Sequence, residues 1–327
     1  MGKNTQNIKI INWGILGTGE ISNEFVVGIE NIPNTNLQAI GSRSIFSAKS
    51  FAKKHNVPKY FGSYEELVSD KSIDVVYIGT VNQAHKDNIL LCLKNNKSVL
   101  CEKPITLNSN ELEEIITYKK NKNIFLMEAM RTRFLPHILK LEELLKKDTI
   151  GKVRLLQLNF GFEKGKNLDR LFKLEYGGGA LLDMGIYGIS LAVKLFGYPV
   201  DIKFIANIGE TGVDEDITII FKHNNDVISQ ISCSIAVNMP LIGLITGTKG
   251  TINMSPKWWR ESHLNVSTRN SKKYRIDMNS ELTFSNYLVN EVNRCILNKL
   301  EESENMRIDD SFAIMKIIDS INSNWIK

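Results

Sequence analysis

The sequence predicts an α/β, Rossmann-type domain followed by an α+β domain with a large, mostly antiparallel open sheet. In the first 130 residues, short apolar runs alternate with helical patterns, which is typical of a parallel sheet covered by helices. After residue 150 the pattern changes to alternating strands with hairpin signals between them, such as His223-Asn-Asn-Asp226. Two amphipathic helices, 286–297 and 311–325, follow. We therefore expect two domains, residues 1–127 and residues 128–327.

The composition is that of an ordinary globular protein and argues against several function classes. The 327 residues are 43% hydrophobic and 24% charged, with a formal net charge of +5. The lysines are scattered rather than interleaved with aromatic residues, so we expect no nucleic-acid partner. No apolar run approaches the roughly 20 residues that span a bilayer, and residues 8–16 lack a signal-peptide cleavage site. The four cysteines show no metal-binding spacing, so we expect buried thiols, no metal and a cytoplasmic location.

The first motif is a glycine turn between a predicted strand and a predicted helix. Residues 8–16 form a short apolar run, Gly17-Thr-Gly-Glu-Ile-Ser22 follows, and a helical pattern continues to Ile29. Gly17 turns the chain, Gly19 lets the backbone approach a pyrophosphate, and the helix N-terminus offers free N–H groups. Ser22 replaces the third glycine of the usual fingerprint and is still small enough for close helix–strand packing. The context predicts a dinucleotide-binding site.

The end of the second predicted strand, residues 36–41, bears on the choice of cofactor. An NAD site usually has an acidic residue here, which accepts a hydrogen bond from the ribose 2′-hydroxyl. This chain has Ser42 and Arg43 instead. A hydroxyl beside an arginine suits a 2′-phosphate, although a plain surface arginine is the alternative. We expect NADP to be preferred over NAD.

Further cofactor contacts are expected where the strand at residues 74–78 ends, because open parallel sheets bind ligands at the carboxyl ends of their strands. Asn82 and His85 follow this end and are candidates for lining the cleft, with His85 assigned to capping or packing rather than chemistry. The predicted cofactor-binding residues are Gly17, Thr18, Gly19, Glu20, Ile21, Ser42, Arg43, Gly79, Thr80, Asn82, His85, Glu102 and Lys103.

The second motif is Glu102-Lys103-Pro104, directly after the apolar run 98–101. Proline favours an extended conformation for the residue before it, which would direct the lysine into the cleft. A lysine so placed adds positive charge, and positive charge favours the ionised form of a neighbouring phenol.

The third motif is a run of three glycines, residues 177–179, followed by an apolar helical pattern. Asp183 and Tyr187 are four residues apart and would project from one face near the start of this helix. A carboxylate beside a phenol suits binding of a polyol hydroxyl and exchange of its proton. A capped helix with a surface tyrosine is the alternative interpretation.

Together these motifs resemble the glucose-fructose oxidoreductase / inositol dehydrogenase (Gfo/Idh/MocA) family. The branch looks like the dimeric dihydrodiol dehydrogenases and the NADP-dependent D-xylose dehydrogenases. The resemblance covers most of the first 200 residues. Besides the three motifs it rests on Phe61-Gly-Ser-Tyr-Glu-Glu-Leu67, Tyr77-Ile-Gly-Thr80 and Met127-Glu-Ala-Met-Arg-Thr-Arg-Phe-Leu-Pro136.

The resemblance implies that Lys103 and Tyr187 are the catalytic pair and that Asp183 binds substrate hydroxyls. It also implies a homodimer, or a dimer of dimers, whose partner covers one face of the second sheet. One departure concerns the substrate pocket, because Arg131 stands where dihydrodiol dehydrogenases have a tryptophan. A cation there suits a sugar, or a substrate with a carboxylate or a phosphate. The expected substrate-binding residues are therefore Arg131, Asp183 and Tyr187.

The function that follows is an NAD(P)-dependent oxidoreductase of the aldose 1-dehydrogenase kind. It would transfer hydride between nicotinamide and the carbinol of a sugar, polyol or related diol. Alternatives are a trans-dihydrodiol dehydrogenase, a catalytically silent cofactor-binding regulatory protein, and an NAD-dependent glycoside hydrolase on the same fold. Both Lys103 and Tyr187 are present, which favours an enzyme over a silent protein. Trp258 and Trp259 lie between predicted strands, where they either line the pocket or pack in the core.

Overall fold

The computed structural model describes residues 9–30, 32–163, 170–260, 262–269, 273–278 and 282–324. Contacts divide the chain into two compact units, which are treated separately below. The first unit comprises Met1–Ile105, Glu111–Ala129 and Ser285–Ile308. The second comprises Thr106–Asn110, Met130–Phe284 and Asp309–Lys327.

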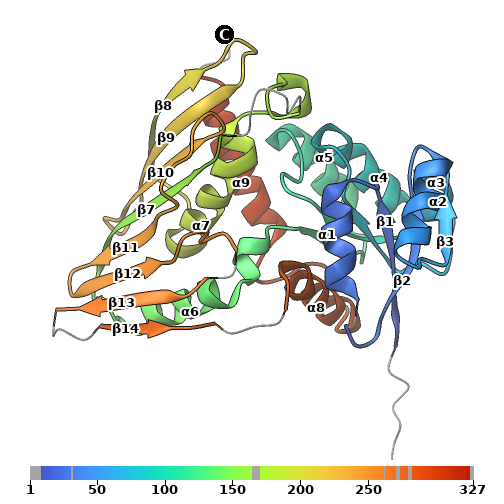
Figure 1. The fold of residues 1–327 in the computed structure, drawn as a ribbon, viewed down its shortest axis with the longest axis horizontal. Helices are drawn as coiled ribbons and strands as arrows, with labels where there is room; N and C mark the ends of the chain where they lie inside the picture. The colour runs from blue at the N-terminus through green and yellow to red at the C-terminus, as the bar shows by residue number, and fades with distance from the viewer. Residues whose placement is uncertain are drawn as a thin grey trace, which may run out of the picture. The chain divides into compact units, whose positions relative to one another are not determined.

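The first unit is built on a six-stranded parallel sheet in the order β3-β2-β1-β4-β5-β6 (Figure 1). This is the strand order of a doubly wound dinucleotide-binding fold, in which the chain reverses direction across the sheet between β1 and β4. The strands are β1 Ile11–Leu16, β2 Thr35–Gly41, β3 Lys59–Phe61, β4 Val75–Ile78, β5 Ser98–Cys101 and β6 Leu126–Glu128. The helices are α1 Glu20–Ile29, α2 Ile45–Lys54, α3 Tyr64–Ser69, η1 Asn82–Ala84, α4 His85–Lys94 and α5 Ser109–Lys119.

Strand β1 is apolar because both of its faces are covered. Ile11, Trp13 and Ile15 are fully buried, and all four residues of β4 are buried beside it. Helix α1 packs on the sheet through Phe25, whose ring stacks on that of Tyr77 with centroids 3.7 Å apart. The predicted Rossmann-type domain is confirmed.

Helix α8 (Phe284–Leu297) belongs to the first unit although it comes after the second sheet in the sequence. The indole Nε1 of Trp13 donates to Asn293 Oδ1 at 3.1 Å, and Asn293 Nδ2 donates to Thr35 Oγ1 at 2.6 Å. Asn286 donates to the carbonyl of Gly28 at 2.5 Å. The grouping therefore differs from a single boundary at residues 127/128, because a late helix completes the first unit.

The second unit is built on an eight-stranded sheet in the order β14-β13-β12-β11-β7-β10-β9-β8 (Figure 1). Every neighbouring pair is antiparallel except β7 and β10, which run parallel. The sequence predicted a mostly antiparallel sheet, but it did not predict strand β14. The strands are β7 Val153–Gly161, β8 Asp201–Ile208, β9 Asp214–Lys222, β10 Ile228–Ser234, β11 Gly243–Gly247, β12 Gly250–Met254, β13 Leu264–Thr268 and β14 Lys273–Ile276.

One face of this sheet is covered by helices. Leu156, Leu158 and Phe160 alternate along β7 and are buried on that face. Helix α7 (Ile186–Phe196) packs there so closely that a Cβ at Gly188 would lie 2.7 Å from Ile231 of β10. In the part of the chain that the structure describes, no helix of this unit lies on the opposite face (Figure 1). The unit's other helices are η2 Arg131–Phe134, α6 Pro136–Lys146, η3 Leu174–Tyr176, η4 Leu181–Gly185 and α9 Ile308–Asn322.

The predicted C-terminal helices both form, and the predicted end of the last one at Trp325 lies outside the described residues. Among the described residues, one helical stretch, Leu174–Phe196, is long and apolar enough to cross a membrane. Its most apolar window is 78% buried inside the protein, as expected of a core helix. The four cysteines are free and buried, as predicted.

Candidate active site

The turn after β1 has the backbone that the first motif predicts. Gly17 has a φ of +100°, and a Cβ there would lie 2.7 Å from the carbonyl oxygen of Gly79. The turn is held between the ends of two strands, because Gly17 N donates to Gly41 O and Gly79 N donates to Leu16 O, both at 2.9 Å. A residue other than glycine at position 17 would therefore be strained and would displace the end of β4.

Helix α1 begins at this turn with an open N-terminus. Gly19 occupies the N-cap position, so no side chain caps the helix there. A Cβ added at this position would meet no atom within 4 Å. The first N–H groups of a helix lack intrahelical partners and carry the positive end of its dipole, so they bind anions. Thr18, Glu20 and Ile21 belong to the same turn and first helical residues. The arrangement fits the pyrophosphate of a dinucleotide.

The small side chain at position 22 allows α1 to pack closely on the end of β4. A Cβ added at Gly79 would lie 2.5 Å from the buried Oγ of Ser22. The two positions together let α1 approach the end of β4, which the third glycine does in the usual fingerprint. Serine serves here because the facing residue is itself a glycine.

The turn after β2 presents Arg43 to solvent and keeps Ser42 inside. Ser42 Oγ accepts from the backbone N of Ser44 at 3.3 Å and is 8% exposed, whereas Arg43 is exposed. Tyr64 lies beside the Arg43 guanidinium; burial raises the pKa of Tyr64, and the positive charge of Arg43 opposes that rise. Within this turn, therefore, Arg43 presents a charged side chain at the surface, whereas the exposed Ser44 caps α2 by accepting from the backbone N of Ser47 at 3.3 Å.

His85 is fully buried beneath the cofactor loops. Its Nδ1 lies 2.8 Å from the carbonyl oxygen of Pro104, and its Nε2 lies 3.1 Å from that of Thr80. Burial lowers the pKa of His85, against the opposing effect of its contacts with the carbonyls of Pro104 and Thr80. Asn82 is also buried, and Asn88 donates to Thr80 Oγ1 at 3.0 Å. His85 thus bridges the backbones after β4 and β5, a packing role that agrees with leaving it out of the chemistry.

Lys103 follows β5 in a backbone that is fixed on both sides. Glu102 N donates to Ile78 O at 3.0 Å, and the Glu102 carboxylate accepts from Tyr77 Oη at 2.7 Å and from Lys103 N at 3.2 Å. On the other side, the carbonyl of Pro104 is held by His85. The lysine therefore stands at the carboxyl end of a core strand, as the second motif predicts.

The three glycines of the third motif are each required by their surroundings. Gly177 and Gly179 have φ values of +66° and +106°, where glycine is favoured. A Cβ at Gly178 would collide with the carbonyl oxygen of Leu171, and one at Gly179 would collide with the carboxylate of Asp214. The predicted helix follows this turn.

Asp214 occupies the N-terminus of that helix from inside the protein. Its Oδ2 accepts from the backbone N of Leu181 at 2.6 Å, and the side chain is 5% exposed. Burial raises the pKa of Asp214 to about 7, against the opposing effect of the backbone N–H groups of Leu181, Asp214 and Ala180, and Asp216 raises it further. The sequence analysis missed this residue, because only the fold brings the start of β9 to a helix 33 residues away.

The helix does not start as a regular α-helix. Leu181–Gly185 form a π-turn, and α7 continues from Ile186. Asp183 lies in the π-turn and Tyr187 in the first turn of α7. Such π-turns occur often at functional sites, because they change the direction in which side chains leave the helix. The helix was predicted; its π-turn was not.

Aromatic rings and two arginines surround this pair. Tyr187 is 3% exposed, its ring centroid is 5.8 Å from that of Phe160, and Phe160 stacks on Trp259 at 3.7 Å. The guanidinium of Arg131 lies over the Tyr187 ring, 5.5 Å from its centroid. Arg170 forms an ion pair with Asp183, Nη2 to Oδ1 at 3.3 Å.

The tryptophan pair packs in the core rather than lining an open pocket. Trp258 and Trp259 are 1% and 3% exposed. Trp258 Nε1 donates to the carbonyl of Asn159 at 3.1 Å, and its own carbonyl lies 2.8 Å from His137 Nε2. Of the two interpretations of this loop, packing is the one that the structure supports.

Two family models match this chain. Residues 11–130 match the oxidoreductase family with an NAD-binding Rossmann fold, and residues 138–253 match the GFO/IDH/MocA C-terminal domain. The chain belongs to the Gfo/Idh/MocA oxidoreductase family. It is therefore an oxidoreductase with an NAD(P)-binding domain, and the resemblance drawn from the motifs is confirmed.

Among curated members of the family, the trans-1,2-dihydrobenzene-1,2-diol dehydrogenase of Xenopus tropicalis is 37% identical over 319 residues, covering 94% of this chain and 96% of that protein. Among solved structures, a 3-ketoreductase from Actinomadura kijaniata in complex with NADP has a TM-score of 0.86 at 21% identity, covering 96% of this chain and 98% of that one. An aldose-aldose oxidoreductase from Caulobacter crescentus has a TM-score of 0.87 at 22% identity, covering 96% and 97%. The structural neighbours establish the shared fold.

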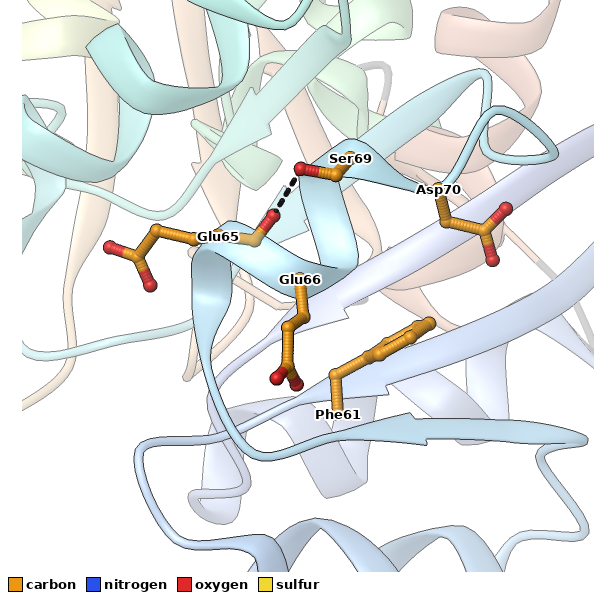
Figure 2. Close-up of a pocket in the computed structure, with 5 residues that line it drawn as sticks. All are labelled: Phe61, Glu65, Glu66, Ser69 and Asp70. Atoms are coloured by element: carbon orange, nitrogen blue, oxygen red, sulfur yellow. Dashed lines mark hydrogen bonds between the residues drawn. The ribbon is translucent and has the colours of Figure 1, made fainter.

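One open depression in this family member adjoins the turn after β2, because Ser42 N donates to the carbonyl of its lining residue Phe61 at 3.2 Å. It measures about 550 Å³ and is lined by Phe61, Glu65, Glu66, Ser69 and Asp70 (Figure 2). The hydroxyl of Ser69 donates to the carbonyl of Glu65 at 2.7 Å, and Asp70 pairs with Lys59 at 2.7 Å. These contacts stabilise helix α3, so we assign no ligand to the depression.

Proposed function

We propose that this chain transfers hydride between NADP and the carbinol of a sugar, polyol or related diol, in the manner of an aldose 1-dehydrogenase. The first unit would bind the cofactor and the second the substrate. The observation that carries the proposal is the placement of Asp183 and Tyr187 at the start of one helix, between an aromatic cluster and two arginines. A carboxylate and a phenol so placed suit hydroxyl binding and proton exchange.

The residues that would hold the cofactor are those predicted from the sequence. The open N-terminus of α1 and the Gly17 turn would take the pyrophosphate, and Arg43 the 2′-phosphate. When bound, NADP supplies the hydride acceptor. The nicotinamide end is assigned to the segments that follow β4 and β5, which carry Gly79, Thr80 and Lys103.

Tyr187 is the proposed acid/base. Its Oη would take the proton of the carbinol hydroxyl during oxidation and return it during reduction. Lys103 is the proposed partner of Tyr187, and Asp183 would orient the substrate through a neighbouring hydroxyl. Phe160 packs against the phenol ring, Trp259 stacks on Phe160, and together they would restrict water on that side. Proton transfer by a positioned group contributes on the order of 10²–10⁴-fold to the rate.

Replacing Tyr187 by phenylalanine tests this assignment. The variant keeps the ring, and with it the packing on Phe160 and Arg131. We expect kcat to fall by roughly 10²-fold or more, while NADPH binding, followed by fluorescence titration, is unchanged. Turnover close to that of the wild type would contradict the role of Tyr187.

Lys103→Ala is expected to lower kcat as well. If the two side chains act as one unit, the double variant should be hardly slower than the slower single variant. The comparison needs single-turnover rates for all four proteins. Losses that simply multiply would show that Lys103 acts independently of Tyr187.

A second candidate function is oxidation of a trans-dihydrodiol. The identity of 37% to a protein with that name favours it, whereas Arg131, in place of an aromatic wall, argues against an aromatic substrate. Assays of aldoses, polyols and trans-1,2-dihydrobenzene-1,2-diol with NADP and with NAD separate the two candidates. A higher kcat/KM for the dihydrodiol than for any sugar or polyol would favour the second.

We also propose that the chain works as a cytoplasmic homodimer, closed through the sheet face that carries no helix. Ile205 of β8, Ile220 of β9 and Ile228 of β10 are 80%, 45% and 45% exposed. Strand pairing places Lys203 and Gln230 on either side of Ile220, and Lys222 beside Ile228. A twofold contact of this face with its copy would bury the isoleucines. Sedimentation that shows only the 37.0 kDa monomer at micromolar concentration would contradict it.

A further inference from the structure

We infer that the substrate of this site carries an anionic group, a carboxylate or a phosphate, which Arg131 and Arg170 recognise. The inference rests on the proposed function in one respect only, that Asp183 and Tyr187 contact the reacting part of the substrate. All four residues belong to the second unit. The geometry that carries the inference is the approach of one arginine to each member of the pair.

Arg131 is placed beside the phenol by its neighbour in the sequence. Arg133, two residues later in η2, is 2% exposed and donates through Nε to Ser190 Oγ of α7 at 2.9 Å. It also donates through Nη1 to Asp310 at 2.8 Å and through Nη2 to the carbonyl of Ser190 at 3.2 Å. These bonds fix η2 on the helix that carries Tyr187. Arg131 is therefore held over the Tyr187 ring by the fold.

The two arginines of η2 have different electrostatic environments. The charge of the buried Arg133 faces the partly exposed carboxylate of Asp310 in an ion pair, so it serves the structure. The guanidinium of Arg131 lies 5.5 Å from the ring centroid of the proposed acid/base. A guanidinium presents a planar fork of donors that matches a carboxylate or a phosphate. An anionic group near the reacting carbinol would lie within reach of that fork.

Arg170 adds a second positive charge on the Asp183 side. Its side chain is 47% exposed and that of Asp183 is 16% exposed. The ion pair holds the carboxylate in place and also offsets its negative charge, which would otherwise repel an anion. Because the Arg170–Asp183 pair is partly exposed, solvent screens its charge, and we expect Arg170 to make the smaller contribution to anion binding.

Three polyols of one carbon skeleton test the inference: D-glucitol, which is neutral, D-gluconate, which has a carboxylate beside a carbinol, and D-glucitol 6-phosphate. Their binding is measured by titration calorimetry, with the protein alone and with the NADPH-loaded protein. Reduced cofactor prevents turnover of a polyol, so the measurement reports binding alone. We expect at least one anion to bind at least roughly tenfold more tightly than D-glucitol, because a hydrogen bond to a charged group contributes enough free energy for such a difference. Raising the salt concentration should reduce this difference.

Arg131→Gln should remove most of the anion's advantage, measured as the ratio of anion affinity to D-glucitol affinity in the same variant. Arg131→Lys should keep part of the advantage, and Arg170→Gln should lower it less. Arg154→Gln, a change to an exposed arginine of β7, is the matched control and should have no effect. Thermal unfolding of each variant verifies that it is folded.

The outcomes separate this inference from the proposed function. Arg131-dependent anion binding without turnover of any polyol in the presence of NADP would support the inference and contradict the proposed function. Turnover of D-glucitol equal to that of both anions, or equal binding of all three, would overturn the inference and leave the proposed function intact. Undetectable binding of both anions would overturn it as well. Equal loss of D-glucitol and anion binding in Arg131→Gln would show that Arg131 only supports the tyrosine ring.

Discussion

The chain uses two glycine turns to start helices, and the two are completed in opposite ways. After β1, Gly19 leaves the first N–H groups of α1 without a side-chain cap and with open space in front of them. After η3, the N–H group of Leu181 is bound by the buried carboxylate of Asp214, and a Cβ at Gly179 would collide with that carboxylate. The first turn leaves room for a ligand's negative charge. The second is already occupied by a carboxyl group of the protein.

This difference shows why glycine-rich turns with similar sequences need not have the same function. Both need glycine for a positive φ, at Gly17 and at Gly179. What distinguishes them is the group that satisfies the helix N-terminus, the proposed cofactor phosphate in one case and an internal carboxyl group in the other. The internal carboxylate fixes the start of the helix, which suits a segment that must present Asp183 and Tyr187 in a defined direction.

The largest expected effect is on stability, and it appears when one methyl group is added to each turn and the two variants are compared. Gly179→Ala should lower the free energy of unfolding of the second unit by roughly 3 kcal/mol, because it combines a strained φ with a collision. Gly19→Ala should change stability by less than about 0.5 kcal/mol, since its φ is −75° and its Cβ meets no atom. It should instead weaken NADPH binding by roughly tenfold or more, because the backbone there approaches the pyrophosphate.

Urea unfolding and NADPH fluorescence titration of both variants make this test. In the double variant Gly179→Ala/Asp214→Ala the collision is absent and only the φ strain remains. The combined cost should then be smaller than the sum of the two single costs, by roughly 1 kcal/mol or more. Simple additivity would mean that Asp214 does not set the requirement for glycine at position 179.

A medium effect is expected from the pH dependence that Asp214 gives to stability. Burial raises its pKa from 3.8 to about 7 in the folded protein, so folding favours the protonated form. Its contribution to stability is complete below pH ~4 and is lost as the pH rises through about 7. The stability of the wild type relative to Asp214→Asn should therefore fall by about 2 kcal/mol between pH 5 and pH 7.

Urea unfolding of both proteins across this range measures the difference, and the first turn provides the contrast, because no titrating side chain caps α1. A difference between wild type and Asp214→Asn that stays constant from pH 5 to pH 7 would show that the carboxylate is ionised throughout. The two turns would then differ only in the origin of the negative charge.

The smallest expected effect concerns the choice of cofactor at the first turn. A hydrogen bond to a charged group contributes roughly 1.5–3 kcal/mol, and the exposure of Arg43 argues for the lower end. NADP should then be preferred over NAD by about ten- to a hundredfold in kcat/KM. Arg43→Ala should weaken NADP binding and leave NAD binding nearly unchanged. Equal losses for both cofactors would mean that Arg43 only stacks on the adenine.

The first turn could be predicted from the sequence because everything that defines it is local. The strand, the glycines and the helix follow one another within 20 residues, and each has its own pattern. The strand order of the first sheet agrees with this prediction. Only the role of Ser22 needed the structure, because the residue that it faces is Gly79, on another strand.

The second turn could be predicted only in part. Its glycines and the apolar helix were evident, but the cap comes from Asp214, which no local pattern distinguishes from its neighbours Glu215 and Asp216. The same holds for Arg133, whose partners Ser190 and Asp310 are 57 and 177 residues away. Contacts of this kind follow from the pairing of the sheet and the packing of helices on it. A periodic pattern predicts which residues are buried, but not which of them meet.

The late position of helix α8 has a consequence for how the protein is made. The last strand of the first sheet ends at Glu128, whereas the helix that supplies Asn286 and Asn293 to the same unit begins at Phe284. At translation rates of 5–20 residues per second, this interval lasts roughly 8–30 seconds. During that time we expect the indole of Trp13 in β1 to lack its hydrogen-bond partner Asn293. The first unit therefore begins to be synthesised first, but it can be completed only after most of the second unit has been made.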